Sequence, residues 1–246
     1  MWSPFESTKV YILDRASTLF EANQGSVTVV STNSTLPSGF KVQLSGHKAG
    51  NALTLYALID SKNLYRSTNN GFNWSFIGAL PVNAWDVGVA VSLNNPNILY
   101  FGEVETYRSN DGGSSWTKLN NWYDYYNDVP NKLYADMMDF ASFYTNSGTE
   151  FTLIGNHGGI NVSYDNLVST PSIALQGLNV SQYYDVATSP VNPNYFYAGS
   201  QDQGHQRSNA GNATGLEDFT QVISGDYGQM AFSNNGNSFW TQYPGG

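Results

Sequence analysis

Residues 64–74 read LYRSTNNGFNW and residues 106–116 read TYRSNDGGSSW, so the two stretches align without gaps and share their Tyr, Arg, Ser, Gly and Trp columns. Their serines, Ser67 and Ser109, lie 42 positions apart. Weaker copies of the same pattern surround Ser163 (NVSYDN), Ser208 (RSNAG) and Glu21 (LFEANQG). A period of about 45 residues indicates a repeat protein in which each copy folds as one supersecondary unit.

Short apolar stretches flank each copy and predict β-strands. Those just upstream are TLYALI (54–59), NILYFG (97–102), FTLIG (151–155) and YFYAG (195–199). A further apolar segment precedes each of them, another short one follows the copy, and no stretch has helical periodicity. Four short strands with tight turns per repeat predict an all-β fold, a β-propeller of four-stranded antiparallel blades.

The repeat columns predict about five blades plus part of a sixth, in a single propeller region over residues 1–246. The expected blades are residues 1–35, 36–82, 83–122, 133–178, 179–224 and, in part, 225–246. Because a closed propeller must seal its ring between first and last blades, we expect this chain to be a piece of a larger protein. The remainder of that larger chain is then one of its partners.

The composition excludes several classes of function. The chain has 246 residues, no cysteine, 10 Lys+Arg against 19 Asp+Glu, and a net charge of −9. Disulfides, thiolate zinc sites and cysteine nucleophiles are therefore excluded, and nucleic acid and anionic membranes are disfavoured as partners. No apolar run approaches a membrane span, so no membrane insertion is expected. Low charge with many Asn, Ser, Thr, Gly and Tyr favours an extracellular or cell-surface location.

The repeated stretch resembles a known motif. The pattern Ser-x-Asp-x-Gly-x-x-Trp over residues 109–116 is a full Asp-box, the bacterial neuraminidase (BNR) repeat, and residues 67–74 differ only by Asn for Asp. An Asp or Asn side chain accepts hydrogen bonds from its own turn, and glycine permits a positive φ. The resemblance implies a turn between the outer strands of a blade, away from the binding face. Structural roles are thus expected for Ser67, Asn69, Gly71, Trp74, Ser109, Asp111, Gly113 and Trp116.

The C-terminal half resembles secreted bacterial BNR-like proteins related to sortilin-type and xyloglucanase-type propellers. The resemblance rests on ADMMDF (135–140), GNHGGINVS (155–163), LQGLNVSQYYDVATSPVNPN (175–194), GSQDQG (199–204) and SGDYG (224–228). The chain departs from the usual pattern: Tyr134 and Met138 replace two histidines, His157 replaces an aspartate, and Gln203 replaces an asparagine. These departures weaken any metal or acid–base role that the family pattern implies at those columns.

Glycoside hydrolysis needs two carboxylates on either side of the scissile bond, and several acidic residues lie where loops enter inner strands. The catalytic candidates are Asp136, Asp139, Asp202 and Asp226, with Asp86 and Asp185 at similar places. We expect the four, together with Gln201 as a ligand-binding residue, to converge around the propeller axis. Converging carboxylates repel one another, so a calcium ion on Asp136 and Asp139 is one candidate cofactor; closure of each residue's own turn is the structural alternative.

Sialidase activity is disfavoured. Sialidases clamp the substrate carboxylate with three arginines, whereas three of the four arginines here occupy the same column of the repeat. Those three are Arg66, Arg108 and Arg207. Arginines on outer turns cannot meet at the axis, so any enzymatic activity is expected to be glycoside hydrolysis of another kind.

An aromatic insertion over residues 120–134, NNWYDYYNDVPNKLY, lengthens one repeat by about ten residues. Its rings are Trp122, Tyr123, Tyr125 and Tyr126. Tyrosine and tryptophan on a loop form half-polar platforms that suit a sugar ring or a protein partner. The alternative is that they pack against a neighbouring blade.

Two functions remain. The first is a non-catalytic recognition or scaffold propeller of a secreted or cell-surface bacterial protein that binds glycan or an extracellular protein. The alternative is a xyloglucanase-like glycoside hydrolase that uses two of the axial aspartates. We favour the first, because the scaffold motifs are recognisable and the catalytic pattern is not.

Overall fold

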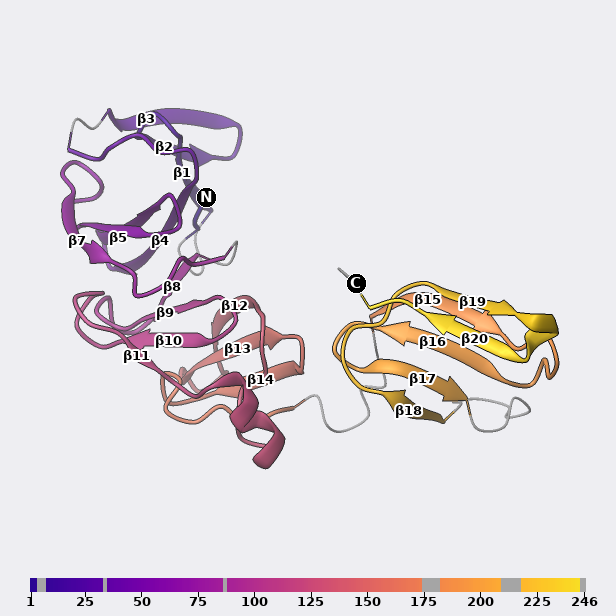
Figure 1. Cartoon of the computed structure of the whole chain (residues 1–246). Helices are drawn as coiled ribbons and strands as arrows, with labels where there is room; N and C mark the ends of the chain where they lie inside the picture. Colours follow the sequence, from indigo (N-terminus) through magenta and orange to yellow (C-terminus); the bar gives the residue numbers. More distant parts are fainter. Residues whose placement is uncertain (4–7, 33–34, 86–87, 174–181, 209–217, 244–246) are drawn as a thin grey trace. The chain divides into compact units, whose positions relative to one another are not determined.

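The computed structural model describes residues 1–3, 8–32, 35–85, 88–173, 182–208 and 218–243. The chain divides into two compact units, Met1–Gln176 and Gly177–Gly246, which we call unit 1 and unit 2. Both are built of antiparallel β-sheets joined by short turns (Figure 1). Both helices formed by the described residues are short 3₁₀ turns, and neither has the length or apolarity to cross a membrane.

Unit 1 contains four sheets, which follow one another in sequence order (Figure 1). The first two comprise β1 (Lys9–Leu13), β2 (Thr18–Asn23) and β3 (Ser26–Thr32), then β4 (Val42–Ala49), β5 (Ala52–Ile59), β6 (Asn63–Ser67) and β7 (Ser75–Ala79). The next two comprise β8 (Val89–Val91), β9 (Leu99–Gly102), β10 (Thr106–Ser109) and β11 (Thr117–Lys118), then β12 (Met137–Tyr144), β13 (Glu150–Asn156) and β14 (Gly159–Ser163). The 3₁₀ helix η1 (Trp122–Asn127) lies between β11 and β12.

Unit 2 contains a four-stranded sheet and a two-stranded sheet. The strands are β15 (Tyr183–Thr188), β16 (Phe196–Ser200), β17 (Gly204–Ser208) and β18 (Phe219–Ile223), then β19 (Met230–Ser233) and β20 (Ser238–Thr241), with the 3₁₀ turn η2 (Asn234–Gly236) between the last two. Aromatic rings pack between the sheets: the ring centroid of Tyr197 lies 5.4 Å from that of Phe232 and 5.0 Å from that of Phe239. His205 is buried and stacks on the same rings.

Two sheets that have only three named strands are completed by short segments. Trp2 exchanges backbone hydrogen bonds with Tyr11 of β1, at 2.9 and 2.7 Å, and so lies beside the first sheet. Residues 171–173 run beside β14, where Ile173 N–H donates to the Ile160 carbonyl at 2.9 Å. The prediction of an all-β fold with four-stranded antiparallel blades, about five of them and part of a sixth, is confirmed.

In unit 1 the sheets meet through their inner strands. β4 contacts β1 and β8, and β12 contacts β9 of the preceding sheet. Consecutive sheets therefore pack face against face around their first strands, which is the arrangement of propeller blades.

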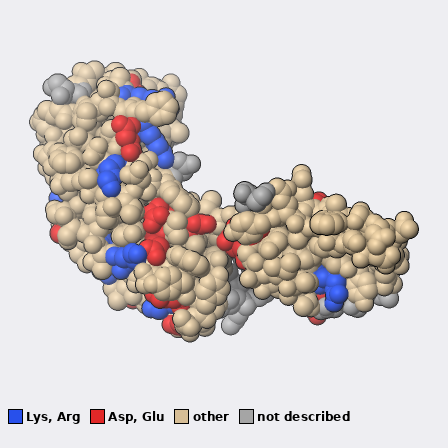
Figure 2. Space-filling model, viewed as in Figure 1, with Lys and Arg blue, Asp and Glu red and all other residues tan. Residues whose placement is uncertain are grey.

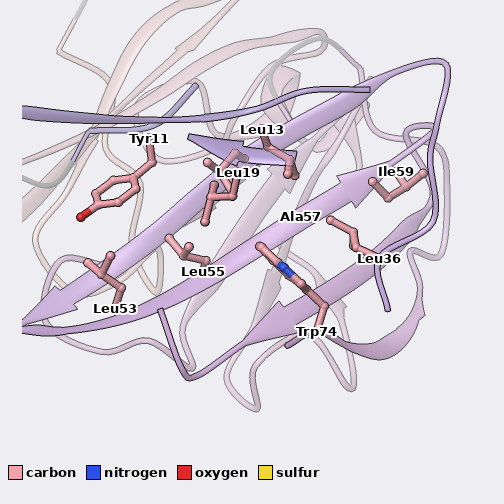
Figure 3. Packing of buried hydrophobic residues seen from close by; sticks show 10 residues of the cluster. Tyr11, Leu13, Leu19, Leu36, Leu53, Leu55, Ala57, Ile59 and Trp74 are labelled. Atoms are coloured by element: carbon pink, nitrogen blue, oxygen red, sulfur yellow. The ribbon is translucent and has the colours of Figure 1, made fainter. Parts of the chain in front are cut away.

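Hydrophobic clusters fill the space between these sheets. Between the first two sheets, Leu19, Leu55 and Trp74 are almost completely buried beside Tyr11 and Ile59 (Figure 3). A second cluster lies between the second and third sheets and a third between the third and fourth. Burying each leucine of this kind contributes about 1.5–3 kcal/mol, so inter-sheet packing holds the blades together.

The turn after β6 is closed by side chains of the repeat. Ser67 Oγ donates to Asn69 Oδ1 at 2.9 Å and accepts the Gly71 N–H at 3.0 Å. Asn69 Oδ1 also accepts the Asn73 N–H at 2.9 Å, and the Trp74 indole donates to the Gly71 carbonyl at 3.1 Å. All of these bonds lie within eight residues, so side chains of the local sequence close this turn.

The turns after β10 and β14 repeat this geometry. Ser109 Oγ donates to Asp111 Oδ1 at 2.8 Å and accepts the Gly113 N–H at 2.9 Å. In the weaker copy, Ser163 makes the same pair of bonds with Asp165 and with Leu167, which takes the place of glycine at φ +63°. The Glu21 copy is wrong as a box: its strands are joined by a two-residue hairpin, Gln24 and Gly25, both at positive φ. The turn after Ser208 lies outside the described residues.

Candidate functional site

Strand direction places the connections of unit 1 at two opposite ends of the sheets. In an antiparallel blade, the turn between the second and third strands lies at the end where the chain enters the next blade. The serine-closed turns after β6, β10 and β14, which we call the box turns, join the third and fourth strands of their blades. They lie at the opposite end of the sheets. We call the part of the first end that surrounds η1 the entry face; it comprises residues 103–105, 120–136 and 157–158.

η1 is fastened to this face by hydrogen bonds at its start. The Asn121 N–H donates to Asp124 Oδ2 at 2.9 Å, and the Asp124 N–H donates to the Asn121 carbonyl at 3.0 Å. The Trp122 N–H donates to Glu105 Oε1 at 3.2 Å, and Glu105 also pairs with Lys118. The sequence suggests no helix here, because six residues are too few for periodicity to be visible.

Tyr134 is the anchor of the aromatic insertion. It is 9% exposed, its ring centroid lies 4.9 Å from that of Tyr125, and its hydroxyl shares a 3.1 Å hydrogen bond with the Tyr126 hydroxyl. Burial also raises the pKa of Tyr125. Trp122, Tyr123 and Tyr126 remain 38%, 54% and 61% exposed. Within the insertion, buried Tyr134 therefore supports its neighbouring rings, and three rings remain at the surface.

The rings meet edge to face. Trp122 makes angles of 78° with Tyr123 and 76° with Tyr126, and Tyr126 makes 82° with Tyr134. The rings therefore do not lie in one plane: their perpendicular arrangement presents ring edges and hydroxyl groups as well as ring faces. A role of these residues in ligand binding stays a proposal.

Asp136 and His157 form a pair beside Tyr134. Asp136 Oδ2 lies 3.0 Å from His157 Nδ1, and both side chains are largely buried. Asp136 has φ +64°, and its N–H donates to the Val104 carbonyl at 3.0 Å. Any Cβ on Gly158 would collide with Tyr134, so glycine lets the His157 turn lie against the aromatic anchor. Sequence reasoning missed the roles of Tyr134 and His157; the only signal was that both replace residues of the family pattern.

Asp139 and Asp185 close β-bulges in their own strands. The ladder shifts between Met137 and Asp139, after which Asp139 Oδ1 accepts the Phe140 N–H at 2.8 Å. The same shift precedes Asp185, whose Oδ1 accepts the Val186 N–H at 2.9 Å while its Oδ2 accepts the Met230 N–H at 2.8 Å. These contacts match the structural alternative for this pair of positions.

Gln201, Asp202 and Asp226 belong to unit 2. Asp226 Oδ1 accepts the Asp202 N–H at 2.8 Å, and Asp202 has φ +60°. Desolvation raises the pKa of Tyr184, with further contributions from Asp226 and Asp202. Asp202 and Asp226 are therefore neighbours, as are Asp136 and His157 in unit 1. Convergence of the two groups on one axis and calcium binding by Asp136 and Asp139 stay predictions, and Asp86 lies outside the described residues.

Three hollows of about 320–330 Å³ lie in unit 1. One is lined by small residues of the inner strands, Ser45, Ala90 and Ser142, with Trp2. A second lies beside Trp2 and His47, and the third is lined by Asn131, Lys132 and Thr170 at the flank of the aromatic insertion. None of these three hollows is lined by a candidate carboxylate.

Charge is sparse on the molecule, and most of the surface in view is uncharged (Figure 2). The entry face is an exception with a clear sign. Its carboxylates are Glu103, Glu105, Asp124, Asp128 and Asp136. Lys132 is the only lysine within the residues that define the face. Lys118 pairs with Glu105 but lies at the end of β11, beside the face.

Comparisons with known proteins show likeness of structure only. No family model matches the chain, and no curated protein matches it. Similar solved structures include YCF48 bound to D1 peptide, with 14% identity, 92% of this chain and 82% of that chain covered, and a TM-score of 0.36.

Two GH74 structures are also similar. The GH74 xyloglucanase from Xanthomonas campestris has 17% identity, coverage of 94% of this chain and 39% of that chain, and a TM-score of 0.46. The GH74 enzyme from Niastella koreensis has 16% identity, coverage of 94% and 32%, and a TM-score of 0.39. The chain thus spans less than half of either GH74 chain. The class of protein, an all-β propeller of repeated blades, rests on the chain's own strand topology.

Proposed function

We propose that this chain is a non-catalytic recognition propeller that binds a protein or glycan partner through the entry face of unit 1. The observation that carries the proposal is the aromatic insertion, in which the exposed rings of Trp122 and Tyr126 pack against buried Tyr134. The exposed ring of Tyr123 packs in turn against Trp122. Rigid aromatic side chains lose little conformational entropy on binding and dominate recognition surfaces. Membership of a secreted or cell-surface bacterial protein with BNR-type blades is part of the proposal, supported by the low charge and the box turns.

The contacts of the carboxylates also favour recognition over catalysis. A hydrolase must hold one carboxyl group as an acid and another as a base or nucleophile, on either side of a substrate. Asp136 is paired with His157, Asp139 caps its own strand, and Asp226 binds a backbone N–H. Each therefore makes a contact that stabilises a turn.

Binding is tested with glycan and peptide arrays probed by the labelled full chain. Trp122→Ala should remove most of the signal, because the substitution deletes the central exposed ring. Phe72→Ala is the matched control: Phe72 is 58% exposed, but it lies on the box turn after β6, at the opposite end of the sheets. Equal signal from both variants would refute the entry face as the binding surface.

The alternative is a glycoside hydrolase, and the observation that favours it is the grouping of Asp202, Asp226 and Tyr184 in unit 2. Release of reducing ends from a panel of β-glucans, measured for the wild type and for Asp202→Asn, decides between the two. Release that the substitution abolishes would establish catalysis and overturn a binding-only function. A calcium ion would reveal itself as a melting temperature that falls on addition of chelator.

A further inference from the structure

We propose that the entry face of unit 1 recognises a basic peptide segment, in which lysine or arginine side chains flank apolar residues. This inference rests on the proposed function and specifies the chemistry of its partner. It starts from the same three exposed rings, Trp122, Tyr123 and Tyr126.

The rings are held in place before any partner arrives. Tyr126 is hydrogen-bonded to Tyr134 through its hydroxyl, and Trp122 packs against the rings of Tyr126 and Tyr134 at 6.1 and 6.3 Å. The Trp122 N–H is fastened to Glu105. Preorganisation of this kind lowers the entropic cost of binding, which is the main obstacle to affinity on a small surface.

The sign of the charge around the rings selects the partner. Asp124 lies on η1 and Asp128 at its end, and Glu105 accepts the Trp122 N–H. Glu103 and Asp136 belong to the same face, where the Met137 N–H donates to the Glu103 carbonyl. Glu105 and Lys118 neutralise each other as an ion pair, and Lys132 offsets one further carboxylate. The other carboxylates leave the face with a net negative charge. The remaining negative potential attracts cations and repels phosphate, sulfate and anionic lipid headgroups.

The ring geometry suits basic side chains. Because the rings meet at angles of 76–86°, the face presents both ring faces and ring edges. An arginine guanidinium lies over a single exposed ring, and a lysine stem lies along a ring edge with its ammonium group near a carboxylate. Both modes use the ring and the acidic residue together, which is the combination that the entry face offers.

The probes are three sets of immobilised synthetic peptides of equal length and equal apolar content. Their charged positions are Lys and Arg in the first set, Asp and Glu in the second, and Ser and Gln in the third. The labelled full chain should bind the basic set, and its affinity should fall as salt is added. Trp122→Ala should weaken this binding about tenfold, as is typical for a central aromatic residue.

A charge variant tests the electrostatic part separately. Asp124→Asn combined with Asp128→Asn keeps the side-chain size and acceptor oxygens, and should weaken binding several-fold while flattening its salt dependence. Asp218→Asn, which replaces an exposed carboxylate of unit 2, is the control. It should change neither the affinity for the basic peptides nor the salt dependence of binding. Melting temperatures of all variants establish that each is folded.

Equal binding of the three peptide sets would overturn the inference, and so would binding to the basic set that survives both Trp122→Ala and the charge variant. If no peptide set binds but a glycan array gives a signal that Trp122→Ala removes, the basic-peptide inference is wrong and the proposed function stands. If neither the peptide sets nor the glycan array gave a binding signal, both the basic-peptide inference and the proposed function would be refuted.

Discussion

Each described box turn depends on one serine hydroxyl, which makes three hydrogen bonds, the longest of them with the N–H two residues on. The hydroxyl donates to the Asn or Asp side chain two residues on and accepts the backbone N–H four residues on, as at Ser67, Ser109 and Ser163. The acceptor is neutral in the first turn and charged in the other two. Charge at this position therefore makes the second and third turns sensitive to acid, while the first is not.

Asp111→Asn tests this acid sensitivity. Hydrogen bonds from the Ser115 hydroxyl and N–H, and from Ser109, lower the pKa of Asp111 from 3.8 to about 2. A carboxylate with a depressed pKa contributes stability above its unfolded value and loses it as pH falls toward the folded value. We expect the free energy of unfolding of the wild type to fall between about pH 4 and about pH 2, and the variant to lose less over the same interval.

The measurement is denaturant unfolding at pH values across this range. Asp165 remains in the variant as an internal reference: burial raises its pKa, but hydrogen bonds from Ser169 and Ser163 outweigh this and lower it. Identical acid sensitivity of variant and wild type would contradict the role of Asp111.

The box turns after β10 and β14 differ at one position: Gly113 in the first corresponds to Leu167 in the second. A Cβ on Gly113 would collide with Leu64 of β6. In the next sheet Thr106 of β10 holds the register position of Leu64, and the box carries Leu167, which is 1% exposed. We infer that the two positions compensate for each other in volume.

A double-mutant cycle of Thr106→Leu and Leu167→Gly tests this compensation. Leu167→Gly alone leaves a cavity and should cost about 2–5 kcal/mol; Thr106→Leu alone overpacks the site and should cost about 1–3 kcal/mol. The double variant recreates the Leu64–Gly113 arrangement and should be more stable than the sum predicts, by about 0.5–3 kcal/mol. Additive losses in the free energy of unfolding would show that the two side chains do not meet.

At the scale of whole elements, buried polar side chains reinforce the packing between sheets. Glu150 of β13 reaches the turn after β8, where it accepts the Leu93 N–H at 2.8 Å, the Asn94 N–H at 3.1 Å and the Ser92 hydroxyl at 2.8 Å. A carboxylate suits this place because all three partners are donors. The contact ties the third sheet to the fourth.

Glu150→Gln should lower the free energy of unfolding by about 1–3 kcal/mol, because the amide brings a further donor toward buried donors. Asp60→Asn is the matched control: Asp60 is exposed and accepts one N–H, that of Lys41 at 3.0 Å, and its replacement should have little effect. Thermal unfolding of both variants measures the difference. If both variants lowered the free energy of unfolding by the same small amount, Glu150 would not hold the third and fourth sheets together.

The sheets are predictable from sequence where local chemistry repeats. The stretches 54–59, 97–102, 151–155 and 195–199 overlap β5, β9, β13 and β16. The first three of them stand at a nearly constant distance from a turn that its own side chains close. The bulges before Asp139 and Asp185, and the support of the insertion by Tyr134, are not predictable in this way. They depend on contacts between segments that no local pattern encodes.

The whole chain distributes its apolar core unequally between the two units. The three clusters of buried hydrophobic residues lie within unit 1, whereas Ala198 is the one buried hydrophobic residue among those described in unit 2. Small domains bury too little apolar surface to be stable alone. The difference in core content makes a direct prediction about fragments.

Residues 1–176 expressed alone should fold and unfold cooperatively with a β-type circular dichroism spectrum, while residues 177–246 alone should show no cooperative transition. The reason is that, among the described residues, the clusters of buried hydrophobic side chains lie in the first fragment. A sharp thermal transition in the shorter fragment, or its absence in the longer, would contradict this distribution of stability.

The box turns also bear on the order of events during folding. The serine bonds of each turn span four residues, so the chain closes them at almost no cost in loop entropy. Contacts this local form early, whereas packing between sheets brings together residues some forty positions apart, as when Ser31 Oγ donates to the Gly71 carbonyl. Serine-to-alanine changes at the box should therefore slow folding more than they speed unfolding. During synthesis, each hairpin would therefore leave the ribosome with its box turn already closed, before the following blade is available for packing.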